Sequence, residues 1–448
     1  MTGARVAVVG GGLAGIAAAL ELADAGATVT LFEARARLGG ATYSVRRKDH
    51  WIDNGQHVLL RCCTAYRSFL TRLGVEQLVP IQPRLRIPVL REEEPPAFLR
   101  RAPLPAPLHL VPTLLRYSLL GPRERVSALR AAAALRKLDP ADQTLDLQTF
   151  GGWLRAHGQS DAAVAELWNL ITLPTLNLPA SEGSLLLATM VFRTGLLDAA
   201  DACDIGVPSV PLQQLHGDAA ATALEHAGVR VALGTPVRKA EGRRILLDED
   251  GHDADAVIVT VPHDSVARIV PDGAVDSGAL AALGSSPIVN LHLHFDRRVL
   301  DEPFAAAEAA SPLQWLFDRT QASEVTQGQL VSVSLSGAQA DIAEPLATLR
   351  ERYLPAVQRL LPAARDAEIL DFTATREPRA TFRASPGTAR LRPGPRTTVP
   401  GLYLAGAWTN TGWPATMESA VRSGLAAARA ALSDLAQGRA HEAVEAVA

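Results

Sequence analysis

The sequence contains few cysteines. Its 448 residues include only three, Cys62, Cys63 and Cys203. Three cysteines cannot build the disulfide framework of a small secreted domain, and their spacing matches neither a zinc site nor a redox pair. The chain therefore suits a reducing cytoplasm.

A surplus of one charge and a long apolar run are also absent. The chain has 44 basic and 47 acidic residues, without a block of like charges, so nucleic acid is not an expected partner. Uncharged stretches are broken by Gly, Pro, Asn or His, so no membrane-spanning helix is predicted. The first apolar segment, 6–9, leads into a glycine motif, so we expect no cleaved signal peptide. These features predict a cytoplasmic protein that is either soluble or peripheral on the inner face of the cell membrane.

The residues that are present predict a large folded protein. Apolar residues make up 48% of the chain and charged residues 20%, and the length suggests two or three domains. A strand at 5–9, a glycine turn at 10–15, a helix at 16–25 and a strand at 28–32 form a β-α-β unit. Further helices are expected at 144–200, 213–227 and 418–431, and further strands at 229–233, 256–261, 286–296, 329–335 and 402–405. The Ala- and Glu-rich C-terminal tail is expected to fray.

Residues 80–125 have a different composition. Ten prolines between 80 and 122 predict that regular structure is repeatedly broken. The apolar stretch 108–120 is followed by a basic helix at 123–138. The pattern fits a core helix with a solvated face and a segment in the membrane headgroup region equally well.

The glycine turn Gly10–Gly15 matches G-x-G-x-x-G. Gly10 permits the tight turn, Gly12 lets the backbone approach a pyrophosphate, and Gly15 lets helix and strand pack closely. The helix N-terminus supplies amide donors to phosphates. Glu33 closes the second strand 23 residues after Gly10 and can accept hydrogen bonds from a ribose diol, which favours FAD or NAD.

A second motif follows Glu33 directly. The string Glu33-Ala34-Arg35-Ala36-Arg37-Leu38-Gly39-Gly40 resembles the E-x-x-x-R-x-G-G signature of the amine oxidase and carotenoid desaturase superfamily of flavoproteins. The resemblance implies FAD, with Arg37 against the pyrophosphate. Many members have a basic residue next, where this chain has Ala41.

A third motif is narrower. The string Asp53-Asn54-Gly55-Gln56-His57-Val58-Leu59-Leu60 resembles the hydroxysqualene dehydroxylases, squalene-associated FAD-dependent enzymes of bacterial hopanoid synthesis. In the superfamily this segment passes near the flavin ring. The resemblance runs over nearly the whole chain and is most specific here and near the C-terminus.

The C-terminal motif runs from Leu404 through Gly406 and Trp408 to Gly424 and resembles the superfamily's last FAD segment. A strand ends at Gly406, and a helix starting near Met417 directs its N-terminus at the flavin. Ala407 replaces the usual Asp, so we expect backbone contacts to hold the cofactor there. By resemblance, Val237 meets the adenine. Together the motifs place the following residues at FAD: Gly10, Gly12, Leu13, Ala14, Gly15, Glu33, Ala34, Arg35, Arg37, Gly39, Gly40, Ala41, Asn54, Gly55, Gln56, His57, Val237, Gly406, Ala407, Thr416, Met417 and Ala420.

The resemblance implies replacement of an allylic hydroxyl of hydroxysqualene by hydrogen, giving squalene. Such a reaction needs a general acid and a mainly apolar cavity. His57 is the first candidate acid, and Asp53 either orients it or donates the proton itself. A structural role for both, bound to flavin or loop backbone, is the alternative. His292 and His294 share a strand face but have no evident third ligand, so no metal is predicted. No motif identifies the reductant of FAD.

The predicted fold is α/β, with a Rossmann-type FAD-binding domain and a second, α+β substrate domain. The FAD domain is discontinuous, at 1–80, 205–265 and 395–435, and the substrate domain takes 81–204 and 266–394, with the membrane-facing candidate near 103–138. The rival functions are a carotenoid-type (phytoene) desaturase, an amine oxidase, and a non-catalytic flavin-binding scaffold.

Overall fold

The computed structural model describes residues 3–248 and 250–445, and contains a parallel sheet built from distant parts of the chain. Its strand order is β19-β13-β1-β2-β9, and all four neighbouring pairs are parallel. The strands are β1 Arg5–Val9, β2 Thr28–Phe32, β9 Arg230–Ala232, β13 Ala256–Val259 and β19 Leu402–Leu404. The predicted β-α-β unit is therefore confirmed.

Both faces of this sheet are covered, which explains why its central strands are apolar throughout. One face packs on α1 (Leu13–Asp24), α9 (Ala219–His226) and α13 (Met417–Glu445). The other faces α10 (His263–Ile269), α11 (Ser277–Ala282) and the small antiparallel sheet of β10 Lys239–Ala240, β11 Arg244–Leu246 and β12 Gly251–Asp253.

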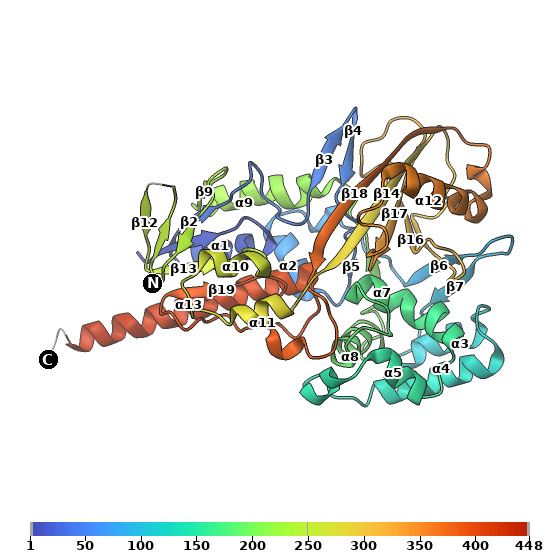
Figure 1. Ribbon diagram of the computed structural model, residues 1–448, viewed down its shortest axis with the longest axis horizontal. Helices are drawn as coiled ribbons and strands as arrows, with labels where there is room; N and C mark the ends of the chain where they lie inside the picture. Colours follow the sequence, from blue (N-terminus) through green and yellow to red (C-terminus); the bar gives the residue numbers. More distant parts are fainter. Residues whose placement is uncertain (1–2, 249, 446–448) are drawn as a thin grey trace.

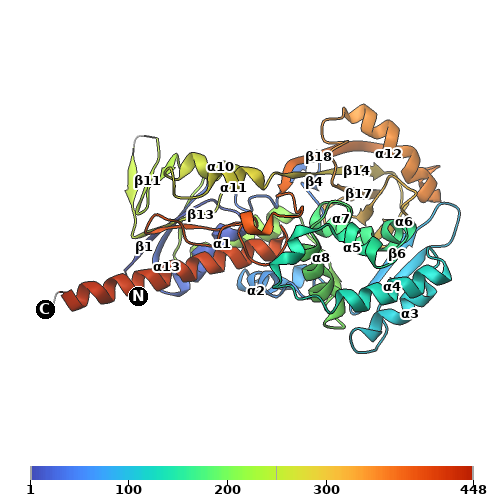
Figure 2. The same cartoon turned by 60° about the horizontal axis from the view of Figure 1, so that its bottom comes forward.

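The closing helix is longer than predicted. It continues to Glu445 instead of fraying after residue 431. In Figures 1 and 2, α13 starts between the two large sheets and runs along the parallel one toward the C-terminus. It packs closely on α1, because Gly424 has no side chain and lies against the backbone of Ala14.

The second large sheet is mixed and has seven strands in the order β18-β14-β17-β16-β15-β6-β7. They are β6 Arg86–Leu90, β7 Ala97–Arg100, β14 Ser286–Phe295, β15 Phe304–Ala307, β16 Trp315–Asp318, β17 Gln329–Ser336 and β18 Ile369–Thr381. The alternation that predicted β14 and β17 is confirmed. The prediction of broken structure around the prolines was wrong for 86–100, where β6 and β7 form a hairpin with Pro88 opposite Phe98.

Helices cover both faces of this sheet as well. On one face lies α12 (Leu346–Leu360), which shares a core with β14 and β17. On the other lie short helices that fill residues 108–197, as the helical prediction for 144–200 required. They include α3 Val111–Arg116, α4 Pro122–Leu135, α5 Phe150–Ala156, α7 Asn169–Leu176 and α8 Leu185–Phe192. Among the residues that the structure describes, no helix has the length and apolar content to cross a membrane.

Further elements lie near the junction of the two sheets. They are the hairpin of β3 Ser44–Arg47 and β4 His50–Asp53, the pair of β5 Leu59–Leu60 and β8 Ile205–Gly206, and α2 Thr64–Arg72. All five strands of the parallel sheet lie in the segments assigned to the cofactor domain. All seven strands of the mixed sheet lie in the segments assigned to the substrate domain.

Candidate functional site

The site lies at the carboxyl edge of the parallel sheet. The strand order reverses beside β1, where β2 lies on one side and β13 on the other. Such a reversal opens a crevice at the carboxyl ends of the strands, which is where α/β sheets bind ligands. The Thr260 hydroxyl, directly after β13, donates to the carbonyls of Val9 and Gly10 and closes the floor of this crevice.

The glycine turn has the geometry that the motif predicts. Gly10 has φ +113°, and a Cβ there would lie 2.5 Å from the Thr260 hydroxyl. A Cβ at Gly15 would overlap the carbonyl of Gly10, so the close packing of helix and strand is confirmed. Gly12 is the N-cap of α1 and makes no side-chain capping bond. The first amide groups of α1 are therefore free to bind an anion such as a phosphate.

The second glycine pair lies directly against the first motif. Gly39 forms a bridge with Gly12, and a Cβ on Gly40 would lie 2.6 Å from the Gly12 Cα. Gly40 also has φ +59°, a conformation that favours glycine. Two backbone segments therefore meet with no side chain between them, which leaves room for a pyrophosphate to contact main chain.

Glu33 stands at the end of β2, where a ribose diol is expected. Its two carboxylate oxygens accept from the amides of Gly11 (2.6 Å) and Arg35 (2.8 Å), which fixes its rotamer. The Thr235 amide donates to the Glu33 carbonyl and brings the loop containing Val237 to the same edge. Residues 235–237 lie in the loop before β10, which begins at Lys239.

Two guanidinium groups lie beside the glycine pair. Arg37 donates to the Gly40 carbonyl at 3.2 Å and lies 3.8 Å above the Tyr43 ring, while Arg35 reaches the same carbonyl at 3.5 Å. Burial, followed by the charge of Arg35, lowers the pKa of Arg37. Positive charge is thus concentrated next to Ala41, which has no cationic side chain of its own.

The C-terminal loop is held by a residue that the sequence motifs did not reveal. The buried Arg392 guanidinium donates to the carbonyls of Ala407, Trp408 and Thr409. The Ser419 hydroxyl also donates to the Ala407 carbonyl (3.1 Å). The loop is therefore fixed through its backbone, without the Asp that Ala407 replaces. Arg392 lies outside the motif, and its only sequence signal is an arginine in a Pro-rich segment.

The start of α13 is also as expected. Thr416 accepts from the Ser419 amide (3.2 Å), and the helix begins at Met417. The Gly406 amide donates to the Ser423 hydroxyl, and Met417 and Ala420 pack against the apolar core formed with α1. The N-termini of α1 and α13 thus both lie at the carboxyl edge of the parallel sheet.

The segment after β4 joins this edge to the mixed sheet. The Asn54 side chain donates to the Ala41 carbonyl and to Glu377 on β18, both at 2.9 Å. The Asn54 carbonyl accepts from the side chains of Asn290 and Thr375. Glu377 was missed by the sequence motifs, because nothing near it in sequence marks a site.

His57 follows on the same loop. Its Nδ1 lies 3.1 Å from the Gly55 carbonyl, which can only accept, so Nδ1 carries the proton of that hydrogen bond. Burial lowers the pKa of His57, while the Gly55 carbonyl and the carboxylates of Asp53 and Glu377 partly offset this by raising it. The second ring nitrogen, Nε2, takes no part in this hydrogen bond and can contact another group.

Asp53 does not orient His57 through a hydrogen bond. Its carboxylate accepts from Ser44 (2.6 Å), the Leu212 amide (3.1 Å) and Arg319 (2.8 Å), and both charged groups are buried. These three bonds tie the end of β4 to β3, to the residue that follows β16 and to the 208–212 segment. The expectation that Asp53 orients the acid or donates the proton is therefore revised to a structural role.

Two buried polar atoms at this loop lack a partner among the described residues, the side-chain nitrogen of Gln56 and the side-chain oxygen of Asn290. Buried polar atoms normally make hydrogen bonds, so an orphan pair points to a bound group. By contrast His292 contacts Ser332 and Thr375, and His294 contacts the Gln327 carbonyl. In the part of the chain that the structure describes, no His, Cys, Asp or Glu cluster could hold a metal.

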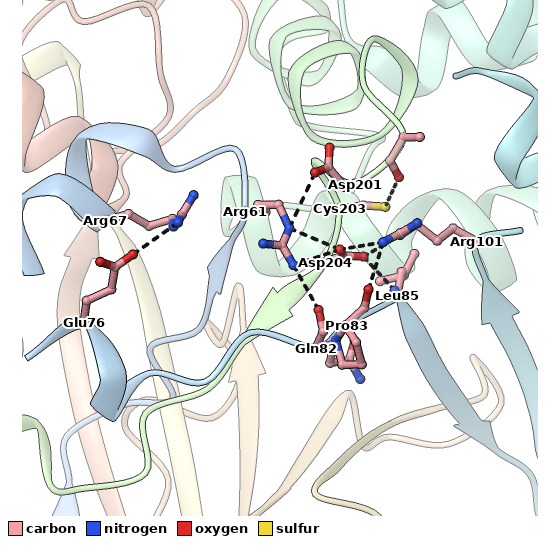
Figure 3. Close-up of polar contacts among 11 residues, drawn as sticks. Arg61, Arg67, Glu76, Gln82, Pro83, Leu85, Arg101, Asp201, Cys203 and Asp204 are labelled. Atoms are coloured by element: carbon pink, nitrogen blue, oxygen red, sulfur yellow. Dashed lines mark hydrogen bonds and ion pairs between the residues drawn. The ribbon is translucent and has the colours of Figure 1, made fainter. Parts of the chain in front are cut away.

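The far end of the loop is anchored by buried charge. Figure 3 shows Arg61 and Arg101 converging on Asp204, which is fully buried. Arg101 Nε lies 2.6 Å and Arg61 Nε 3.2 Å from the carboxylate, and the Leu85 amide donates to it as well. The loop from Asn54 to Arg61 is therefore fixed at both ends.

Two tryptophans near the C-terminal loop and an ion pair in the helical segment have structural roles. Trp408 is buried and donates to the Val261 carbonyl, so it is a core residue, while Trp413 is partly buried with Arg422 above its ring. Arg193 and Asp198 form an ion pair beside α4, away from the glycine motifs.

Comparison with known proteins agrees with this geometry. The model of the family "Flavin containing amine oxidoreductase" matches residues 13–432. The chain belongs to this family. It is thus an FAD-dependent oxidoreductase, and the cradle fits that cofactor: free helix amides, a side-chain-free glycine contact, a carboxylate directly after β2 and orphan polar atoms at the loop after β4.

Individual relatives span nearly the whole chain. Hydroxysqualene dehydroxylases of Sinorhizobium fredii and Rhodopseudomonas palustris are 29% and 30% identical to it, over 96% and 97% of this chain and 99% of theirs. A 15-cis-phytoene desaturase of Narcissus pseudonarcissus is 25% identical over 96% of this chain and 80% of that protein. The structure of an oxidoreductase from Methanosarcina mazei has a TM-score of 0.74 at 18% identity, covering 94% of this chain and 99% of that one. At that identity the structural likeness supports the fold alone, and it confirms the predicted class.

Proposed function

We propose that this oxidoreductase reductively removes the allylic hydroxyl of hydroxysqualene to give squalene. The observation that carries the proposal is the position of His57 on the loop at the junction of the two sheets: its Nδ1 is held by the Gly55 carbonyl, while Asn54 of the same loop bonds Glu377, whose charge favours the imidazolium. The full-length similarity to hydroxysqualene dehydroxylases supports the same substrate.

The reaction balances with one proton and one hydride. Protonation of the hydroxyl makes water the leaving group, and the carbon that loses it accepts hydride, so R–OH, a proton and a hydride give R–H and water. Bound reduced FAD supplies the hydride and is oxidised. The chain must hold the substrate, exclude other water and deliver the proton.

His57 is the proposed proton donor. Because Nδ1–H is bound to the Gly55 carbonyl, the transferable proton is on Nε2 of the imidazolium. His57 is partly exposed, and its partial burial lowers its pKa, so its imidazolium is a stronger acid than a solvated one. Glu377 acts as a positioning residue: its charge favours the imidazolium, and its bond to Asn54 orients the loop.

A carotenoid-type desaturase is the second candidate. Relatives of that activity match this chain over most of its length, although at lower identity. Desaturation removes hydride from the substrate and needs no protonated leaving group, so it leaves a proton donor at His57 without a role.

A substrate panel separates the candidates. Purified, FAD-loaded protein is incubated with hydroxysqualene under argon after reduction with dithionite, and separately with phytoene or a primary amine under oxidising conditions. We expect squalene from the first incubation and no product from the others. Conjugated product from phytoene without squalene would instead favour the desaturase.

A further inference from the structure

The segment 101–138 has a charge opposite to that of the whole protein. It contains seven arginines or lysines and one acidic residue, Glu124, whereas the full chain has a net charge of −3. Glu124 caps α4, since it accepts from the Gly121 amide, and it also bonds the Ser160 hydroxyl. The basic charge of this segment is therefore not balanced within it.

The same segment exposes large apolar side chains. Leu104, Leu108 and Leu115 are 42%, 53% and 47% exposed. Their backbone is held in place: the Ala102 amide donates to the carbonyl of the buried His109, and α3 is anchored by Leu114. The leucines are thus presented outward on an ordered scaffold and cannot simply turn into the core.

Helix α4, which together with the residues just after it carries most of the basic side chains, lies beside the leucine-bearing segment. In Figures 1 and 2, α3 and α4 lie side by side at the end of the molecule away from the N-terminus. Five cations of the segment are exposed, and of these only Arg136 forms an ion pair within the described residues, with Asp198 at 3.7 Å. We call this surface the basic–apolar patch; it comprises Leu104, Leu108, Leu115, Arg116, Arg123, Arg130, Arg136 and Lys137.

A pocket of about 430 Å³ opens in the patch. Pro107 of the leucine-bearing loop and Ala133, Arg136 and Lys137 of the α4 end line it, together with the Arg193–Asp198 pair. Three cations against one carboxylate leave the pocket positive, so it favours an anion such as a lipid phosphate.

We propose that the basic–apolar patch docks the protein on a bilayer that contains anionic phospholipid. The leucines enter the boundary between headgroups and acyl chains, while the cations and the pocket contact phosphates. Exposed apolar side chains alone, or basic residues alone, bind a bilayer weakly. Together they reinforce each other at an anionic surface. The inference deepens the proposed function, since a long terpenoid dissolves in the bilayer, but its test needs no turnover.

Vesicle sedimentation of the full chain tests the docking. We use vesicles of phosphatidylcholine alone, or of equal parts phosphatidylcholine and phosphatidylglycerol. The wild type is expected to bind the anionic vesicles at least about tenfold more tightly than the phosphatidylcholine vesicles. Its binding to the anionic vesicles should weaken at high salt. The triple variant Arg116→Gln, Arg123→Gln, Arg130→Gln should lose about tenfold on anionic vesicles, and Leu104→Ser, Leu108→Ser, Leu115→Ser should lose binding to both.

Matched controls lie outside the patch. Changing the exposed Arg243, Arg350 and Arg365 to Gln removes the same charge, and Leu147→Ser removes a leucine that is 70% exposed; both should bind like the wild type. Squalene formation from detergent-solubilised hydroxysqualene should be unchanged in the patch variants, which separates docking from chemistry. Wild-type protein that binds neither vesicle, or patch variants that bind as the wild type does, would overturn the proposal.

Discussion

At the scale of single residues, the site depends on how burial and charge act on one imidazole. Burial has the largest effect on His57 and lowers its pKa, while the nearby carboxylates act in the opposite direction. A donor of this kind is effective only while it holds its proton, so turnover is expected to fall as the pH rises above the pKa of His57.

The pH profile of three proteins tests this assignment. In the wild type, turnover should fall with rising pH along a limb whose midpoint lies below about 6.5, the usual imidazole value. His57→Gln should lower turnover by about 100-fold or more and remove the limb. Glu377→Gln keeps an acceptor for Asn54 but loses the charge that raises the pKa of His57, so the limb should move to lower pH. An unchanged limb in His57→Gln would exclude His57 as the donor.

At this scale the sequence predicted the backbone geometry of the glycine motifs, because that geometry depends on local residues. Gly10, Gly15 and Gly40 are confirmed as positions where a side chain would collide. Arg392 and Glu377 could not be found in this way, since each acts through contacts with residues far along the chain. The contacts of Asp53 favour its structural alternative, and the sequence could not decide between the two because its partner Arg319 is 266 residues away.

At the scale of elements, the cofactor cradle depends on the contact of the first helix turn with the second glycine pair. Gly12 and Gly40 meet through backbone, so added atoms would force the two segments apart. The strand alternation and glycine spacing predicted these elements well. The proline-rich β6–β7 hairpin was missed because pairing with β15 and packing in the core override the local tendency to break.

Gly40→Ala tests the cradle. The variant should bind FAD at least about tenfold more weakly, because its Cβ would lie 2.6 Å from the Gly12 Cα. Gly74→Ala is the matched control: Gly74 also has a positive φ, +75°, but a Cβ there meets nothing within 4 Å. Both variants share the backbone strain of alanine at positive φ, so a difference in FAD affinity measured by fluorescence titration isolates the steric contact. Equal affinity in the two would contradict this reading.

At the scale of the whole molecule, buried neutral histidines make stability depend on pH. Burial lowers the pKa of both His216 and His292 to about 3. An unfolded histidine has a pKa of about 6.5, so between 6.5 and 3 the unfolded chain binds more protons than the folded one. The contribution of these two histidines to the free energy of unfolding is therefore fully present above about pH 6.5 and is lost as the pH falls.

Chemical unfolding at several pH values measures this loss. Each of the two histidines is expected to contribute a slope of up to about 1.4 kcal/mol per pH unit between about 6 and 4. His292→Asn should reduce the slope, whatever its effect on stability at neutral pH, whereas substitution of the exposed His226 by Gln should not. A slope identical in wild type and His292→Asn would contradict the assignment.

The central claim is the chemistry, and a stoichiometric single turnover tests it most directly. Protein carrying reduced FAD is mixed with one equivalent of hydroxysqualene under argon, and both flavin oxidation and squalene are followed. We expect one squalene for each FAD oxidised in the wild type, at a rate that falls sharply in His57→Gln. Flavin that stays reduced in the presence of hydroxysqualene, or that is oxidised without forming squalene, would contradict the proposed function.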